Sequence, residues 1–123
     1  MPEEFSIQPY LQNSEIIHQT AEQIKKDFAF FDIDVFFDDT TSQAYTTLYD
    51  QIFPQIKKML DLNSQKIFSL LYRIDISETQ LKNESQKNSG QTSEEIITHL
   101  IIKRCLQKVV LRKLYSANNN DGY

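Results

Sequence analysis

The chain has 123 residues, of which 40% are hydrophobic and 24% charged. This length is typical of one domain with a single core and leaves no room for a second. The net charge of −4 argues against general nucleic-acid binding, because domains that track phosphates usually carry a basic excess. Two glycines and three prolines allow few tight turns. We therefore expect residues 1–123 to form a mainly α-helical single domain, a bundle of about four helices.

The N-terminal sequence and the single cysteine bear on the compartment. Met1-Pro2-Glu3-Glu4 lacks the basic region and apolar run of a signal peptide, and no window of about 18 apolar residues occurs. We expect a cytoplasmic protein with no membrane partner. Cys105 has no second cysteine with which to form a disulfide or a paired-thiol metal site. We therefore expect its side chain to be a small buried hydrophobic group.

The first three predicted helices follow from apolar spacing. After Asn13 or Ser14 as N-cap, four positions recur along one helix face: Ile17, Ala21, Ile24 and Phe28. A second helix is predicted over 42–62, with a bend or split at Pro54, which lacks a backbone donor. A third is predicted over 64–75, and its apolar positions lie on one side: Ile67, Leu70, Leu71 and Ile74.

Two capping boxes divide the C-terminal half. Ser77 and Gln80 have the spacing of the first, which predicts one or two helical turns. Residues 82–91 are polar throughout and predict a mobile loop. Thr92 and Glu95 have the spacing of the second box and begin the last long helix. Residues 116–123 carry no apolar pattern and predict a disordered tail.

The stretch 28–39 is rich in phenylalanine and aspartate, and we consider three interpretations of it. Its aspartates alternate with apolar residues, which is the period of a half-buried strand. A two-stranded ribbon is then predicted from residues 5–8 and 30–37. A helix through Phe28, Phe31 and Val35 is the alternative. The third is a metal site at Asp32 and Asp34 or at the whole aspartate cluster, but the stretch lacks the glycine and glutamate of an EF-hand.

Phe30-Phe31-Asp32-Ile33-Asp34 resembles the first motif of haloacid-dehalogenase-type phosphatases. The resemblance implies a nucleophile at Asp32 and an acid/base at Asp34. Val35-Phe36-Phe37 stands where the family has a glycine-containing turn, and the chain is too short for the family's doubly wound sheet. His18 and His99 also lack the spacing of a two-ligand helix motif. We therefore predict no catalytic residue, cofactor or metal ligand.

The last helix has the widest apolar face in the chain. Twelve apolar residues fall in the range from Ile96 to Tyr115. They surround more of the helix than three partner helices would cover. We expect this helix to form a homodimer or another homo-oligomer. The predicted self-association face comprises Ile102, Leu106, Val110 and Leu114. Four further residues are of types that often anchor interfaces, although core-edge packing is commoner at such spacing: Tyr49, Tyr72, Arg73 and Tyr115.

The same helix concentrates positive charge. Residues 92–115 carry a net +3, which leaves −7 for the rest of the chain. Five basic residues define the alternative of a nucleic-acid-binding surface: Lys103, Arg104, Lys108, Arg112 and Lys113. Cations toward a helix C-terminus also complement its dipole, and aromatic residues for base stacking do not interleave with them. Nucleic acid is therefore the less favoured partner.

The segment Leu70-Leu71-Tyr72-Arg73-Ile74-Asp75, followed by residues 100–108, resembles a pattern in small bacterial all-helical proteins to which no activity is assigned. The resemblance implies a helical fold and transfers no site residues. The sequence thus predicts a non-enzymatic protein-interaction or structural module that self-associates or binds an unknown protein partner. Nucleic-acid binding is the alternative, and a metal-dependent phosphatase is a more remote one.

Overall fold

The structure, a computed structural model, describes residues 6–37 and 44–121 of the chain. These residues form five α-helices and one short 3-10 helix, and none of them is in a strand. The elements are η1 (Gln8–Tyr10), α1 (Ser14–Ala29), α2 (Ala44–Leu62), α3 (Ser64–Ile74), α4 (Glu78–Lys87) and α5 (Ser93–Asp121). The expectation of a mainly helical protein is confirmed, but there are five α-helices in the described residues rather than four.

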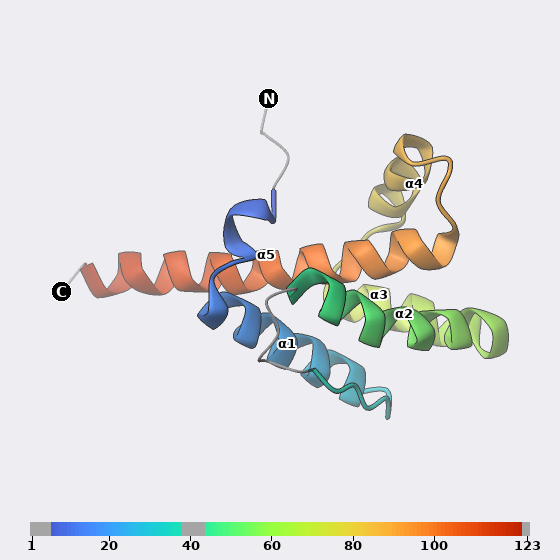
Figure 1. The fold of residues 1–123 in the computed structure, drawn as a ribbon, viewed down its shortest axis with the longest axis horizontal. Coiled ribbons are helices and arrows are strands. Elements are labelled where there is room, and N and C mark those ends of the chain that lie inside the picture. The colour runs from blue at the N-terminus through green and yellow to red at the C-terminus, as the bar shows by residue number, and fades with distance from the viewer. Residues whose placement is uncertain (1–5, 38–43, 122–123) are drawn as a thin grey trace.

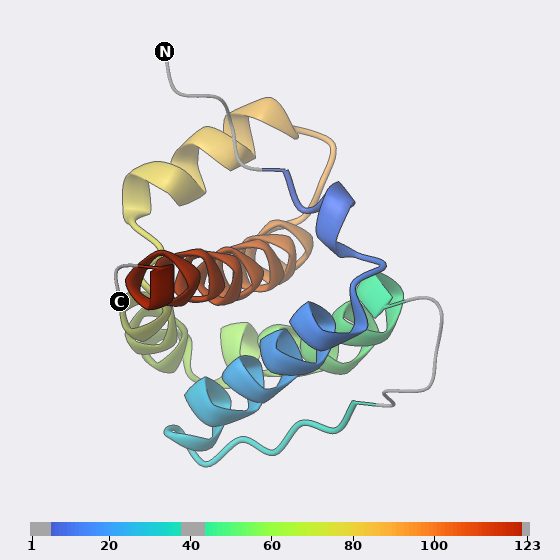
Figure 2. The same ribbon diagram turned by 90° about the vertical axis from the view of Figure 1, so that its left-hand side faces the viewer.

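The long helix α5 lies at the centre of the molecule, and each of the other four α-helices contacts it (Figure 1). Seen along α5, α1 and α2 lie on one side of it and α4 lies on the opposite side (Figure 2). The helix α3 also contacts α1 and α2. The largest fully buried side chains come from α1, α2, α3 and α5, and they include Phe28, Ile52, Leu70 and Ile101. The core is therefore built around α5.

Local signals in the sequence place α1 correctly. Asn13 is its N-cap, because the side-chain oxygen of Asn13 accepts a hydrogen bond from the backbone N–H of Ile16 at 3.1 Å. Of the four predicted apolar positions, three are buried and Ile17 is half-buried. After α1 ends, the chain turns at Asp32, whose φ of 61° lies in the left-handed region. Aspartate tolerates this region better than most residues.

Residues 33–37 are extended after this turn, but they are not a strand. Ile33 and Val35 are buried, while Asp34 and Phe36 are exposed, so the predicted alternation is confirmed. The predicted ribbon of 5–8 with 30–37 is wrong where the structure describes it. An extended segment can bury alternate side chains against helices without pairing, and Pro9 favours the 3-10 turn η1 over a ladder because it has no N–H.

Within the described residues, α2 and α3 match their predicted spans closely, and residues 42 and 43 of the first span lie outside the described part. Pro54 lies inside α2, which continues through it as one helix, so the predicted split does not occur. The helix α3 begins after Asn63, whose side chain accepts a hydrogen bond from the Lys66 N–H at 3.3 Å. Its four predicted apolar residues are all buried. The helix ends at Ile74, and its C-cap Asp75 is left-handed with a φ of 73°.

The helix α4 occupies most of the segment whose polar composition predicts a mobile loop over 82–91, and this prediction is wrong for 82–87. Ser77 Oγ accepts a hydrogen bond from Gln80 N at 3.1 Å, and Gln80 Oε1 accepts one from Ser77 N at 2.9 Å. At the other end, Asn88 Nδ2 donates to the Glu84 carbonyl at 3.1 Å. Leu81 packs against the core. Local hydrogen bonds and one apolar contact thus support a helix that has no apolar period.

The helix α5 begins at the predicted capping box. Thr92 Oγ1 accepts a hydrogen bond from Glu95 N at 3.2 Å, and Glu95 Oε1 accepts one from Thr92 N at 2.8 Å. The helix continues to Asp121, so the predicted disordered tail over 116–123 is wrong for 116–121, where neither proline nor glycine interrupts the chain. Residues 122 and 123 lie outside the described part. No helix within the described residues combines the length and hydropathy needed to cross a membrane.

Candidate functional site

A buried carboxylate joins helices α1 and α3. The side chain of Asp27 in α1 is only 4% exposed, and its Oδ1 accepts a hydrogen bond from Arg73 Nε of α3 at 3.0 Å. Its Oδ2 accepts another from Gln23 Nε2 at 3.1 Å. An unpaired buried charge would cost several kcal/mol, so this pair holds Arg73 in a defined position.

Cys105 of α5 lies beside the same carboxylate. It is fully buried, and its Sγ is 3.9 Å from Asp27 Oδ2. Burial, and then the negative charge of Asp27, raise the pKa of the Cys105 thiol. The thiolate, which is the nucleophile and metal ligand, is therefore disfavoured. Cys105 is a buried thiol, as predicted.

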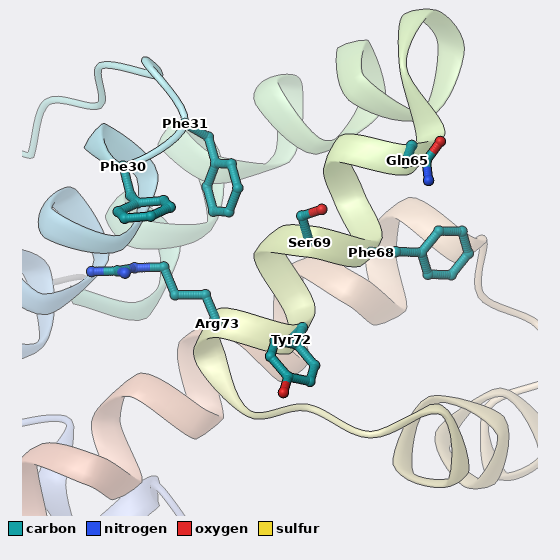
Figure 3. A pocket seen from close by; sticks show the side chains of 7 residues that line it. All are labelled: Phe30, Phe31, Gln65, Phe68, Ser69, Tyr72 and Arg73. Atoms are coloured by element: carbon teal, nitrogen blue, oxygen red, sulfur yellow. The ribbon is translucent and has the colours of Figure 1, made fainter.

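The guanidinium of Arg73 reaches from this carboxylate to the surface. It lies over the ring of Phe30, with its Cζ 4.2 Å from the ring centroid (Figure 3). The Phe30 ring meets the Phe31 ring edge-on at a centroid distance of 5.1 Å. Stacking of this kind is favourable and directional. The ion pair with Asp27 thus also positions the aromatic side chains that follow α1.

Two further aromatic side chains extend from the outward side of α3. Phe68 is 55% exposed and Tyr72 is 88% exposed, one helical turn apart. Both line an open hollow of about 770 Å³ between the end of α1 and α3, together with Phe30 and Phe31 (Figure 3). Both also line a smaller hollow of about 290 Å³ between α3 and α4. We refer to Phe30, Phe31, Phe68 and Tyr72 as the aromatic surface.

This arrangement is suited to binding more than to catalysis. The polar side chains that line the larger hollow are Gln65, Ser69, Tyr72 and Arg73. Arg73 already pairs with Asp27 and stacks on Phe30. Aromatic and arginine side chains are the types that most often anchor protein interfaces. The surface can therefore accept apolar side chains and offers a cation held at its edge.

A third hollow, of about 440 Å³, lies where η1 meets α2 and α5. Tyr45 and His99 line it and form a hydrogen bond of 2.6 Å between the phenol oxygen and Nδ1. Burial, and then the charge of Tyr49, raise the pKa of Tyr45 to about 12. The phenol is therefore protonated at neutral pH. Lys103 also lines this hollow.

The predicted self-association face is largely covered within the chain. Ile102 and Leu106 are fully buried, and Val110 is 4% exposed. Leu106 and Val110 pack in a cluster with Ile7 and with residues of α1. Leu114 is exposed, so only this member of the predicted face is available to a partner. For the other three the prediction is wrong, because the N-terminal segment and α1 cover Leu106 and Val110, and Ile102 lies in the main core.

The five basic residues of α5 do not form one continuous surface. Arg104 pairs with Asp75 at 2.8 Å, and Arg112 donates to Gln23 at 3.0 Å. At about 100° per residue, Arg104, Lys108 and Arg112 fall on one side of the helix. Lys103 and Lys113 point in other directions on the same wheel. The arrangement divides the positive charge, and part of it is already used in contacts within the chain.

The described residues of the acidic stretch and the histidines are not gathered into a metal site. Asp32 and Asp34 are exposed in the turn and the extended segment after α1, where the phosphatase motif would require a strand. Asp38 and Asp39 lie outside the described residues. Within the part of the chain that the structure describes, no three His, Cys, Asp or Glu side chains are close enough to hold a metal ion.

Comparison with protein-family models, with curated proteins and with solved structures finds no match to this chain. The resemblance of Leu70–Asp75 and residues 100–108 to small bacterial helical proteins therefore stays a prediction.

The sequence alone did not indicate the Asp27 pair or most of the aromatic surface. One signal was present: Phe68 and Tyr72 fall outside the buried positions of α3, on a helix whose other outward residues are polar or charged. Tyr72 and Arg73 were predicted only as residue types that can anchor an interface. The exposure of Phe30 and Phe68 distinguishes this surface from core-edge packing.

Proposed function

We propose that the protein is a non-enzymatic interaction module that self-associates, and that the aromatic surface is part of its contact. The observation that carries this proposal is the exposure of Phe30, Phe68 and Tyr72 around one hollow. Scattered exposed apolar residues are ordinary, but large aromatic side chains gathered at a hollow mark an interaction site.

The energy of covering this surface supports the proposal. Burial of one large apolar side chain contributes roughly 1.5 to 3 kcal/mol relative to exposure. Phe30 is already held by Arg73, and both belong to a network that includes the buried Asp27. A partner would therefore order fewer side chains on binding, which lowers the entropic cost of association.

Other observations make the two alternatives less favourable. Nucleic-acid binding would use a basic surface, but Arg104 and Arg112 already make contacts within the chain and the net charge is −4. The phosphatase alternative would use Asp32 and Asp34, which are exposed and follow a helix instead of a buried strand.

Sedimentation equilibrium of the pure protein tests the proposal. At high micromolar concentration we expect a molecular mass of two or more chains. On dilution the mass should fall toward that of a single chain. The double change Phe68→Ser with Tyr72→Ser should raise the dissociation constant at least tenfold, about 1.4 kcal/mol, because it removes two anchors. Leu62→Ser is the matched control: Leu62 is 75% exposed but does not line either hollow next to α3.

A wild-type protein that is strictly monomeric at high micromolar concentration would contradict self-association. Equal effects of the double change and of Leu62→Ser would show that the aromatic surface has no particular role. Far-ultraviolet circular dichroism of each variant provides the check on folding, since these exposed side chains contribute little to the core.

A further inference from the structure

The C-terminal end of α5 is a second exposed apolar surface. Figure 1 shows that α5 extends well past α1 and η1 at this end. Three of its side chains are at least half exposed: Leu111, Leu114 and Tyr115. Their spacing of i, i+3 and i+4 places them on one face of the helix. We call these three residues the α5 end.

The described part of the chain leaves the α5 end uncovered, although most of the helix is buried. The residues just before it, Val109 and Val110, are 0% and 4% exposed. On a helical wheel of about 100° per residue, Val109 and Val110 face the core, whereas Leu111 and Tyr115 face away from it. An amphipathic helix that extends from a folded body is typically stabilised by packing its apolar face on another surface.

The charges beside the two surfaces are of opposite sign. Lys108 and Arg112 flank the face formed by the α5 end, on a helical wheel of about 100° per residue, and Arg112 is exposed. Asp32 and Asp34 are exposed and directly follow Phe30 and Phe31 of the aromatic surface. The one cation that lines the larger hollow, Arg73, is paired with Asp27. The α5 end is apolar with basic neighbours, and the aromatic surface is apolar with acidic neighbours. The two are thus complementary in both polarity and charge.

We propose that the α5 end of one copy of this chain docks on the aromatic surface of a second copy. This inference rests on the proposed self-association and names the two unlike surfaces that meet. Leu114 and Tyr115 enter the hollow between α1 and α3 and contact Phe68 and Tyr72. This is helix-in-groove recognition, in which residues about one turn apart serve as anchors.

Two copies can make this contact twice if they are related by a two-fold axis, each contributing one α5 end and one aromatic surface. A stable interface usually buries about 800 Å² on each partner. A contact made by three side chains is small against that figure, so a reciprocal exchange is the more stable arrangement. The contact between unlike surfaces also predicts a specific behaviour in mixtures.

Two variants test this behaviour. The surface variant carries Phe68→Ser with Tyr72→Ser and keeps its α5 end, while the end variant carries Leu114→Ser with Tyr115→Ser and keeps its aromatic surface. Each alone should self-associate at least tenfold more weakly than the wild type. Mixed in equal amounts, with one variant carrying a fluorescent label, they restore one intact contact. Their mutual dissociation constant in sedimentation should be at least tenfold lower than that of either variant alone.

A charge reversal in the same assay tests whether opposite charges meet at the contact. Lys108→Glu should weaken self-association several-fold, and Asp34→Lys in the same chain should restore it, because the exchange recreates a pair of opposite charges. Both residues lie outside the core, and circular dichroism confirms that each variant is folded. Failure of the second change to restore association would contradict the placement of the α5 end beside Asp34.

The outcomes separate this inference from the proposed function. If the wild type associates but the end variant associates equally well, the aromatic surface meets something other than the α5 end, and the inference is wrong while self-association stands. If both variants are weakened but the mixture restores nothing, the two surfaces do not meet each other, and the inference is again wrong. A monomeric wild type would overturn both.

Discussion

Arg73 links the interior of the protein to its surface. One side of its guanidinium pairs with the buried Asp27, and the same group stacks on Phe30. Asp27 in turn accepts a hydrogen bond from Gln23, which accepts one from Arg112 of α5. Helices α1, α3 and α5 are therefore connected through polar contacts that end at the aromatic surface.

Removal of this cation should destabilise the fold. Arg73→Met keeps an apolar stem of similar length but leaves the Asp27 carboxylate buried without its ionic partner. We expect the free energy of unfolding to fall by about 3 kcal/mol, which urea denaturation measures. Arg112→Met, which loses an exposed hydrogen bond to Gln23, should change it by less than about 0.5 kcal/mol. Similar losses in the two variants would contradict a special role for the buried pair.

The residues of this network show where sequence reasoning stops. Asp27 and Arg73 are 46 positions apart, and nothing in the spacing of either helix pairs them. A buried aspartate next to the apolar positions of α1 looks like any other polar residue of an amphipathic helix. Tyr72 and Arg73 could be recognised as interface residue types, but their neighbours at the surface, Phe30 and Phe31, could only be placed by the tertiary structure.

Among the helices, α4 depends most on its ends. Its described residues include no buried side chain, and Leu81 is its only hydrophobe packed against the core. Most helical stability in proteins comes from packing of an apolar face, which α4 largely lacks. The reciprocal hydrogen bonds of Ser77 and Gln80 are therefore a large share of what maintains it.

Loss of this cap should open α4 without unfolding the molecule. Ser77→Ala should cost about 1 kcal/mol locally, so amide hydrogen exchange in residues 78–87 should accelerate roughly fivefold while the middle of α5 is unchanged. Thr92→Ala is the matched control, because it removes the equivalent bond at the start of α5, a helix held by extensive packing. Unchanged exchange in α4 would show that its contact through Leu81 is sufficient.

The elements that the sequence predicted well are those with both a cap and an apolar period. Asn13, Asn63 and Thr92 each mark a helix start correctly. The errors at 82–87 and 116–121 have one cause: polar helices have no apolar period, and they form here through local bonds or as continuations of a packed helix. The strand prediction failed differently, because alternate burial of Ile33 and Val35 reports a buried side and says nothing of a pairing partner.

At the scale of the whole molecule, the prediction that the apolar face of α5 is wider than the rest of the chain can bury was too strong. It assumed three partner helices, whereas α5 is contacted by four α-helices and by the segment that contains Ile7. Ile102, Leu106 and Val110 are consequently buried. Apolar residues around a whole helix indicate a central position, and only the tertiary structure shows whether the cover comes from the same chain.

Charge is also a property of the whole molecule. With a net charge of −4 and its basic residues on different sides of α5, the protein should show no measurable binding to duplex DNA at physiological salt. An electrophoretic shift assay over a range of salt concentrations tests this. Micromolar, salt-sensitive affinity that is lost with Lys108→Glu and Arg112→Glu would instead identify these residues as a nucleic-acid surface.

The central position of α5 has a consequence for synthesis. It leaves the ribosome after the other four helices, and its contacts with α1 join residues as far apart as Gln23 and Arg112, 89 positions in sequence. Until its 29 residues emerge, which takes roughly 1 to 6 seconds at bacterial or eukaryotic translation rates, α1 and α2 can pack only on α3 and lack the helix that each contacts most. The native core can therefore form only after α5 has emerged, and until then the nascent chain exposes the apolar side chains that α5 covers.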